Sequence, residues 1–206
     1  MKVTLLASTP NATKLVATAA WICTHQDFPT CEDLHPDKCG PLVQRVIGYG
    51  HESILEHASF SFAIEGISRA CSHQLVRYRH SSISQQSQRY VKQKSPEFII
   101  PPSLKQFGYH LYGDDVTNLY NELIAAGVPK EDARYVLPNA TATKLVITMN
   151  ARELRHFFSQ RLCKQAQWEI RELAHEICAQ CLNKEPLLFH GCGPDCANCK
   201  EKEPCK

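Results

Sequence analysis

The hydrophobic pattern changes its period within residues 59–78, and this change limits the folds that the chain can adopt. Apolar residues alternate with polar ones over 59–66, which predicts a half-buried strand that ends at Gly66. From Ile67 the apolar residues recur at helical spacing, which predicts a helix. A strand followed at once by a helix requires a fold in which helices pack on a sheet.

The remaining sequence extends this pattern and shows no internal repeat. We expect further strands over 2–9 and 141–150, and helices over 11–24, 42–50, 114–127, 131–137, 151–161 and 170–181. Asn11 is a candidate N-cap, and Asn150 with Glu153 has the spacing of a capping box. The proline-rich segments 27–41 and 95–103 are predicted to be a loop and an extended connector. The predicted fold class is α+β, with few strands and many helices.

Composition indicates one globular domain without a general affinity for polyanions. The chain has 206 residues, 43% of them hydrophobic, and a net charge of only +2. The apolar run near the N-terminus breaks at Pro10, too early for a signal peptide or a membrane span. We therefore expect a cytoplasmic protein that binds neither membrane nor nucleic acid, in which the eleven cysteines are reduced.

Residues 77–90, with the sequence RYRHSSISQQSQRY, contain three arginines and no acidic residue. A guanidinium group matches phosphate or carboxylate oxygens two at a time, whereas an ammonium group is a point charge. Without neighbouring acids, these arginines lack partners unless a ligand supplies them. The segment is therefore predicted to bind an anion with polar edges.

Other arginines lie near the ends of predicted elements, and together they suggest one polyanion pocket divided over several segments. These are Arg134, Arg152 and Arg161. Common nucleotide and zinc motifs are absent: there is no phosphate-binding P-loop, and the segment GYGHES follows a predicted helix instead of a strand. His51 and His57 lack zinc-ligand spacing, so we assign no metal site there.

Several segments together resemble the flavin-dependent thymidylate synthases. The family signature is Arg-His-Arg, seven residues, then Ser, and here Arg77, Tyr78 and Arg79 are followed after seven residues by Ser87. The segments GHESILEHASFSF, GVPKEDARYVLP, NARELRHFFSQR and AQWEIRELA also resemble family motifs, in family order over residues 1 to about 190.

The resemblance implies a fold, a reaction and an assembly. The fold would consist of helices packed around a small, mostly antiparallel sheet over residues 1–190, followed by a cysteine-rich tail over 191–206. The enzyme would methylate dUMP to dTMP, with methylenetetrahydrofolate as carbon donor and NADPH reducing a bound FAD. It would be a homotetramer whose active sites are shared between subunits.

Family correspondence also implies residue roles. Arg161 would activate the uracil and is the expected catalytic residue. The residues expected at dUMP are Gln74, Arg77, Gln85, Ser87, Arg89, Arg134 and Arg161. Those expected at FAD are Ser53, Arg77, Tyr78, Arg79, Gln85, Asn150, Arg152 and His156, with His51 close by.

Three positions depart from the family pattern. Tyr78 replaces the middle histidine of the signature, so a phenol must substitute for an imidazole. Gln85 stands where some relatives have Glu, and Gln165 where some have His. These changes bear on cofactor affinity and folate geometry more than on the class of reaction.

Two other interpretations of the function remain open besides that of an enzyme. A single-stranded nucleic-acid binder could use the same Arg, Gln and Tyr side chains for backbone contact and stacking. A metal-knotted interaction protein would use the tail, where four cysteines lie at C-x3-C-x2-C-x5-C spacing, although solvated thiols are the simpler interpretation. These cysteines are Cys192, Cys196, Cys199 and Cys205.

Overall fold

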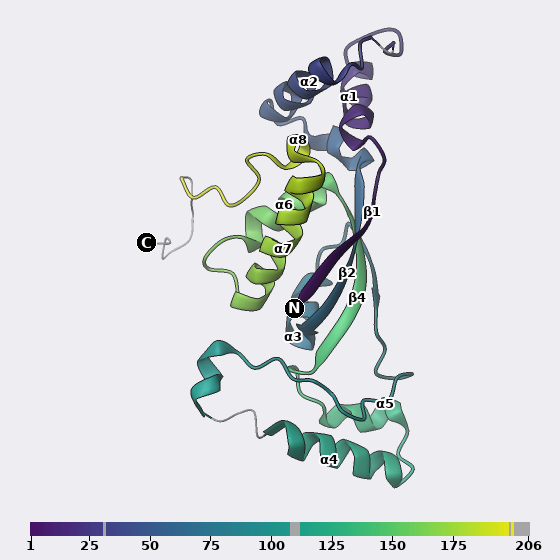
Figure 1. Cartoon of the computed structure of the whole chain (residues 1–206), viewed down its shortest axis with the longest axis vertical. Helices are drawn as coiled ribbons and strands as arrows, with labels where there is room; N and C mark the ends of the chain where they lie inside the picture. Colours follow the sequence, from purple (N-terminus) through teal and green to yellow (C-terminus); the bar gives the residue numbers. More distant parts are fainter. Residues whose placement is uncertain (31, 108–111, 198, 200–206) are drawn as a thin grey trace. The chain divides into compact units, whose positions relative to one another are not determined.

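The computed structural model describes residues 1–30, 32–107, 112–197 and 199. Four strands form one sheet in the order β1-β2-β4-β3, and β1, β2 and β4 are seen side by side in Figure 1. Their bounds are β1 Lys2–Ser8, β2 Ser59–Ser68, β3 Ser81–Gln85 and β4 Ala142–Asn150. The three expected strands are therefore confirmed, and β3 is an addition.

Neighbouring strands run antiparallel. Thr9 bonds to Ser59 near one end of the β1–β2 pair, and Met1 lies beside Gly66 near the other. The hydroxyls of Ser61 and Thr148 similarly face each other across β2 and β4. The expected small antiparallel sheet surrounded by helices is thus confirmed.

The chain divides into two compact units that interleave along the sequence. The first unit comprises Met1–Lys2, Ile64–Arg77 and Ile83–Val146. The second comprises Val3–Ala63, Tyr78–Ser82 and Ile147–Lys206.

The second unit contains six of the described helices. They are α1 Ala12–Ile22, α2 Pro36–Gly48, η1 Glu52–His57, α6 Ala151–Arg161, α7 Trp168–Lys184 and α8 Pro186–Phe189. The core of this unit contains Phe158 of α6, whose ring meets Phe189 edge-on at 6.0 Å, and Phe189 in turn meets Phe60 of β2 at 5.2 Å. These buried rings fix α6 and α8 to the sheet.

The N-terminus of α6 is set by the predicted cap. The side-chain oxygen of Asn150 accepts a hydrogen bond from the backbone nitrogen of Glu153 at 2.8 Å. This satisfies one of the amides that a helix start leaves without a partner. The cap fixes where α6 begins and therefore where Arg152, His156 and Arg161 lie along it.

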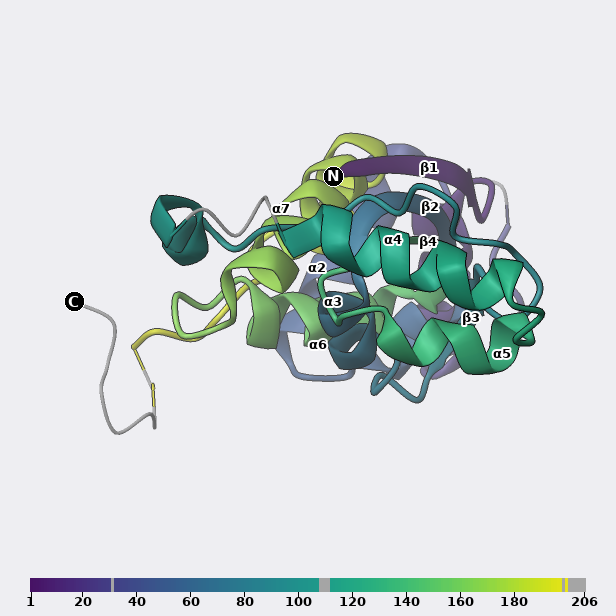
Figure 2. The same cartoon turned by 90° about the horizontal axis from the view of Figure 1, so that it is seen from below.

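The first unit contains the other five described helices. They are α3 Arg69–Leu75, η2 Pro102–Phe107, α4 Tyr112–Ala125, α5 Lys130–Ala133 and η4 Arg134–Val136. Helix α4 lies beside α5 (Figure 2), and Gly127, with a φ of +86°, allows the turn between them. The buried Tyr120 of α4 accepts a hydrogen bond from the backbone of Gln93 at 3.2 Å.

The structure corrects the prediction of a loop over residues 27–41. Helix α2 begins at Pro36, inside that segment, because proline suits the first turn of a helix, where its missing N–H needs no partner. Pro41 is then tolerated within the helix. Counting prolines as loop markers was wrong here.

Three smaller predictions also need correction. Strand β2 continues past Gly66 to Ser68, since Gly66 takes a left-handed backbone with φ +70° without ending the strand. The following helix therefore starts two residues late, capped by Ser68. Asn11 precedes α1 but makes no side-chain cap and has a φ of 52°.

No helix among the described residues is both long enough and apolar enough to span a membrane.

Candidate active site

In the first unit, the side chain of Gln85 joins three elements. Its amide nitrogen donates to the hydroxyl of Ser72 on α3 at 2.9 Å and to that of Thr143 on β4 at 3.2 Å. Ser72 and Thr143 are both buried, and the Ser72 hydroxyl also donates to the backbone oxygen of Arg69 at 2.9 Å. Gln85 of β3 is thereby held in one orientation, as a candidate binding residue must be.

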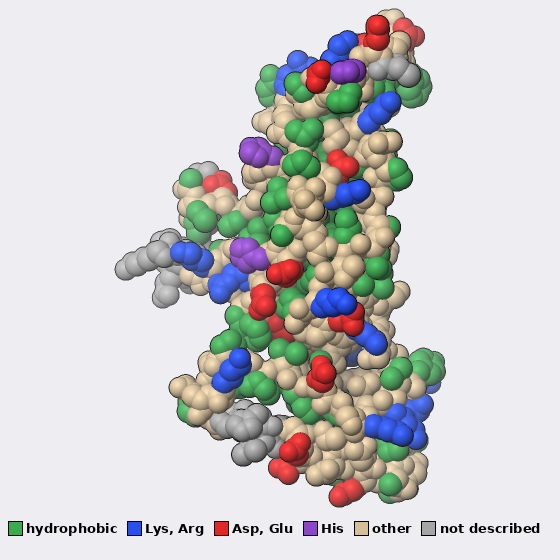
Figure 3. All heavy atoms as spheres, in the orientation of Figure 1, with side chains coloured by type: hydrophobic (Ala, Val, Ile, Leu, Met, Phe, Trp, Pro, Cys, Tyr) green, Lys and Arg blue, Asp and Glu red, His purple; other side chains and the backbone are tan. Residues whose placement is uncertain are grey.

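Arginines gather in the same unit. The pKa of Arg69 is lowered by burial and by the nearby charge of Arg134. Arg89 forms an ion pair with Glu131, and the backbone oxygen of Glu131 accepts a hydrogen bond from Arg134 at 3.0 Å. Figure 3 shows basic side chains over the region of α5. Two arginines near enough to repel each other favour a bound anion.

Sequence reasoning missed Arg69, although a signal was present. The stretch without acidic residues extends over residues 66–96, well beyond the predicted anion-binding segment 77–90, and Arg69 lies within it. The other predicted residues of this unit are Gln74 on α3, the exposed Arg77 just after it, and Ser87, whose hydroxyl accepts from the backbone nitrogen of Arg89 at 3.1 Å.

In the second unit, Tyr78 and Arg161 contact each other directly. The Arg161 Nε donates to the Tyr78 hydroxyl at 2.8 Å, and the guanidinium carbon lies 5.6 Å from the centre of the phenol ring. Burial raises the pKa of Tyr78, while the charge of Arg161 and its hydrogen bond act in the opposite direction. The phenol therefore stays protonated at neutral pH.

A pocket of about 430 Å³ lies in the second unit near the start of α6. Its lining residues are Glu52, Glu56, His80, Asn150, Arg152, Glu153 and His156. Arg152 forms an ion pair with Glu56, and Arg155 lies 3.5 Å from Glu52. Three predicted residues thus share a pocket, namely Asn150, Arg152 and His156.

The other predicted residues of the second unit lie next to members of this lining. Ser53 is exposed on η1 between Glu52 and the buried Ile54, and Arg79 is exposed beside His80. Within the described residues, Arg79 forms no ion pair, and neither does Arg77 of the first unit. Each unit therefore has an exposed arginine that is available to a ligand.

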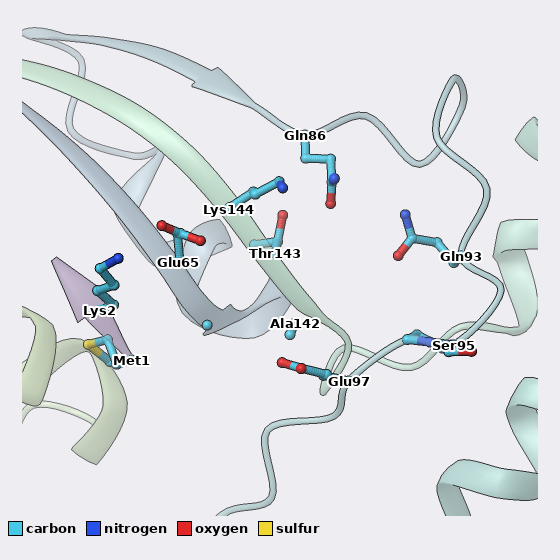
Figure 4. Close-up of a pocket in the computed structure, with 12 residues that line it drawn as sticks. Met1, Lys2, Glu65, Gln86, Gln93, Ser95, Glu97, Ala142, Thr143 and Lys144 are labelled. Carbon is cyan, nitrogen blue, oxygen red and sulfur yellow. The ribbon is translucent and has the colours of Figure 1, made fainter. Parts of the chain in front are cut away.

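A second pocket, of about 470 Å³, lies in the first unit and contains none of the predicted residues (Figure 4). Lysines, glutamates and glutamines line it together, among them Lys2, Glu65, Gln86 and Lys144. This even mixture of charges favours no ligand class, so we assign the candidate site by chemistry and not by cavity size.

The cysteine tail has no metal centre among the residues that the structure describes. No group of three or more His, Cys, Asp or Glu in those ranges is arranged to hold an ion. Cys178 and Cys192 lie with their sulfur atoms 3.8 Å apart. Cys205, the last member of the predicted spacing, lies outside the described residues.

Comparisons with known proteins place the chain in a family. Residues 4–187 match the family model described as "Thymidylate synthase complementing protein". The chain is 42% identical to the flavin-dependent thymidylate synthase of Clostridium tetani, over 96% of this chain and 89% of that protein. It is 44% identical to that of Geobacter sulfurreducens, over 95% and 88%. The chain therefore belongs to the flavin-dependent thymidylate synthase family.

Solved structures agree with this assignment. Flavin-dependent thymidylate synthase ThyX from Helicobacter pylori, crystallised with FAD and dUMP, gives a TM-score of 0.80 at 26% identity, covering 94% of this chain and all of that one. A UMP/dUMP methylase, PolB, from Streptomyces cacaoi shares the fold at a TM-score of 0.81 and 22% identity, over 91% of this chain and 92% of that one. None of these relatives supports the interpretation as a single-stranded nucleic-acid binder.

Proposed function

We propose that this protein methylates dUMP to dTMP, with methylenetetrahydrofolate as carbon donor and with NADPH as the reductant of a bound FAD. The observation that carries the proposal is the family match over residues 4–187, within which all the predicted site residues fall. The structure of the Helicobacter pylori relative with FAD and dUMP supports the choice of substrate and flavin.

The residues proposed to bind dUMP supply the donors that a nucleotide monophosphate requires. They are Gln74, Arg77, Gln85, Ser87, Arg89, Arg134 and Arg161. Arginines suit the phosphate because each can offer two parallel N–H donors, and side chains such as Gln85 suit the polar edge of uracil. Arg89 would exchange its partner Glu131 for the ligand.

Arg161 is proposed to activate the substrate. The pyrimidine is a poor carbon nucleophile while N3 keeps its proton, and a guanidinium held against the ring edge favours the N3 anion. Arginine remains charged at any relevant pH and can contact two ring atoms at once. The Tyr78 hydroxyl bonds only to Nε of Arg161, so the two terminal nitrogens are left for the substrate.

The chemistry of the donor set fits FAD. The proposed residues are Ser53, Arg77, Tyr78, Arg79, Gln85, Asn150, Arg152 and His156. Bound FAD would carry reducing equivalents from NADPH, while these residues bind its phosphates and orient its rings. The lining near α6 contains three carboxylates, so a pyrophosphate there needs more cations than Arg152 alone, and the exposed Arg79, next to His80 of the lining, can provide one.

This shortage of cations in one pocket supports a homotetramer with shared active sites. An arginine from a neighbouring copy could balance the carboxylates of a pocket near α6.

We also propose residues 1–190 as the catalytic domain, 191–206 as a tail, and the cytoplasm as the location. The nine described cysteines are free thiols, which suits a reducing compartment.

The test is direct. Purified protein should be yellow or should become yellow with added FAD, and it should form dTMP when given dUMP, methylenetetrahydrofolate and NADPH. Protein that is colourless, takes up no FAD and forms no dTMP would contradict the proposed function.

A further inference from the structure

Tyr78 is the signature position that departs from the family pattern, and its side chain is packed against α6. Only 6% of the residue is exposed. Its ring meets Phe157 edge-on at a centroid distance of 5.1 Å and His156 at 6.1 Å. A phenol buried in this way needs partners for its hydroxyl group.

Both partners come from the last turn of α6. The hydroxyl lies 2.8 Å from the Gln160 Oε1 and 2.8 Å from the Arg161 Nε. Arginine can only donate, so the tyrosine oxygen accepts from Arg161 and its own proton goes to Gln160. The directions of both hydrogen bonds are therefore determined.

The chain of hydrogen bonds continues to His156. With its oxygen committed to Tyr78, Gln160 presents its amide nitrogen to the His156 Nε2, at 3.1 Å. Because the amide nitrogen of Gln160 can only donate, His156 Nε2 is the acceptor. The ring proton of the neutral imidazole then lies on Nδ1. Arg161, Tyr78, Gln160 and His156 thus form one directed series, in which each group fixes the next.

The series determines how Arg161 presents its guanidinium. Nε is held by Tyr78, and the phenol ring lies along one side of the group. Among the described residues, the two terminal nitrogens of Arg161 have neither a hydrogen-bond acceptor nor an ion-pair partner. The contact at Nε therefore orients the guanidinium group, and its two terminal nitrogens remain available to a ligand.

We propose that Tyr78 is a positioning residue that orients Arg161 toward the pyrimidine, with its hydroxyl held by Gln160 and Gln160 held in turn by His156. The inference rests on the proposed function, because it assigns Tyr78 a task in the activation of dUMP. Tyr78 would act through Arg161 and need not touch the substrate. The phenol oxygen lies farther from Cβ than either imidazole nitrogen, so histidine at this position could not make both contacts from the same backbone.

The test is Tyr78→Phe, which removes the hydroxyl and keeps the ring against Phe157. We expect single-turnover dTMP formation by the pre-reduced enzyme to fall about tenfold or more, in keeping with the loss of one preorganised contact. Because Tyr78 is also proposed to contact FAD, the dTMP rate is expressed per bound flavin, and NADPH oxidation per bound flavin should fall much less than dTMP formation. Tyr49→Phe removes the same atom from a 73% exposed tyrosine and should leave all rates unchanged.

A double-mutant cycle separates positioning from simple packing. Where Arg161 is already Lys, Tyr78→Phe should cause little further loss, because residues that act as a unit are not additive. If the two losses multiply, Tyr78 does not act through Arg161. If Tyr78→Phe fails to fold, Gln160→Met takes its place in the same cycle. Rate losses that multiply there overturn the proposal equally.

The outcomes for the inference and for the proposed function differ. An active parent whose Tyr78→Phe variant forms dTMP at the parent rate overturns the positioning role alone. A parent that binds FAD but forms no dTMP from dUMP overturns both.

Discussion

The side-chain nitrogen of Gln85 lies 2.9 Å from the hydroxyl oxygen of Ser72, a residue that is fully buried. The same nitrogen also donates to Thr143. Gln85→Leu keeps the approximate volume but leaves two buried hydroxyls without this donor, so we expect a loss of about 1–3 kcal/mol in the free energy of unfolding. Thermal or urea unfolding measures it, and dUMP affinity should fall as well.

The matched control is the neighbouring Gln86→Leu. The Gln86 side chain points into the pocket of Figure 4, so its loss should change stability much less. Equal effects at the two positions would show that the contacts of Gln85 contribute nothing specific.

Arg161→Lys keeps the charge and loses the planar fork together with the Nε–H that Tyr78 accepts. We expect dTMP formation in a single turnover with pre-reduced enzyme to fall by at least about two orders of magnitude. NADPH oxidation by the flavin should persist and is measured in parallel. A variant that forms dTMP at the parent rate would exclude Arg161 as the activating residue.

Asn150 caps α6 and is proposed to bind FAD, and substitutions can separate these two roles. Asn150→Ala removes the cap at Glu153 and should lower the free energy of unfolding by about 1 kcal/mol, with weaker FAD binding. Asn150→Asp keeps a cap acceptor, and its charge suits a helix N-terminus, so stability should be retained. It also adds a negative charge to a pocket with three glutamates, so FAD affinity should still fall. Flavin titration beside thermal unfolding distinguishes the two effects.

Cys192 is expected to be an unusually reactive thiol. The hydrogen bond from Cys178, assisted by the charge of Arg155, lowers the pKa of Cys192 to about 7, whereas burial raises that of Cys181. Alkylation of the folded protein should therefore modify Cys192 readily at pH 7.5 and more slowly as the pH falls below 7, since the thiolate is the nucleophile. Mass spectrometry identifies the modified residue.

The variant Cys178→Ala removes the donor and should slow modification of Cys192 at neutral pH. Cys39→Ala, at a buried cysteine elsewhere in the same unit, should leave that rate unchanged. If Cys192 reacts equally fast in both variants, the sulfur contact does not activate it.

Assembly should control activity if active sites are shared. We expect sedimentation at micromolar concentration to show a tetramer, and dilution to monomers to abolish dTMP formation. An active monomer with full flavin occupancy would contradict shared sites.

The sequence determined the chemistry of this protein more fully than its geometry. Local patterns were sufficient for β4, α6 and the start of β2, because alternation, helical spacing and the Asn150 cap act between residues that are close in the chain. The acid-free segment 77–90 indicated an anion site, because a missing counter-charge is already visible in the sequence.

Tertiary structure decided the contacts that join distant segments. Tyr78 and Arg161 are separated by 83 positions, and Gln85 and Thr143 by 58, so no local pattern could pair them. Strand β3 has only five residues, of which Ile83 alone is apolar, and it forms as the outer strand beside β4. Hydrogen bonds of this kind depend on burial and direction, and both arise only when the helices pack on the sheet.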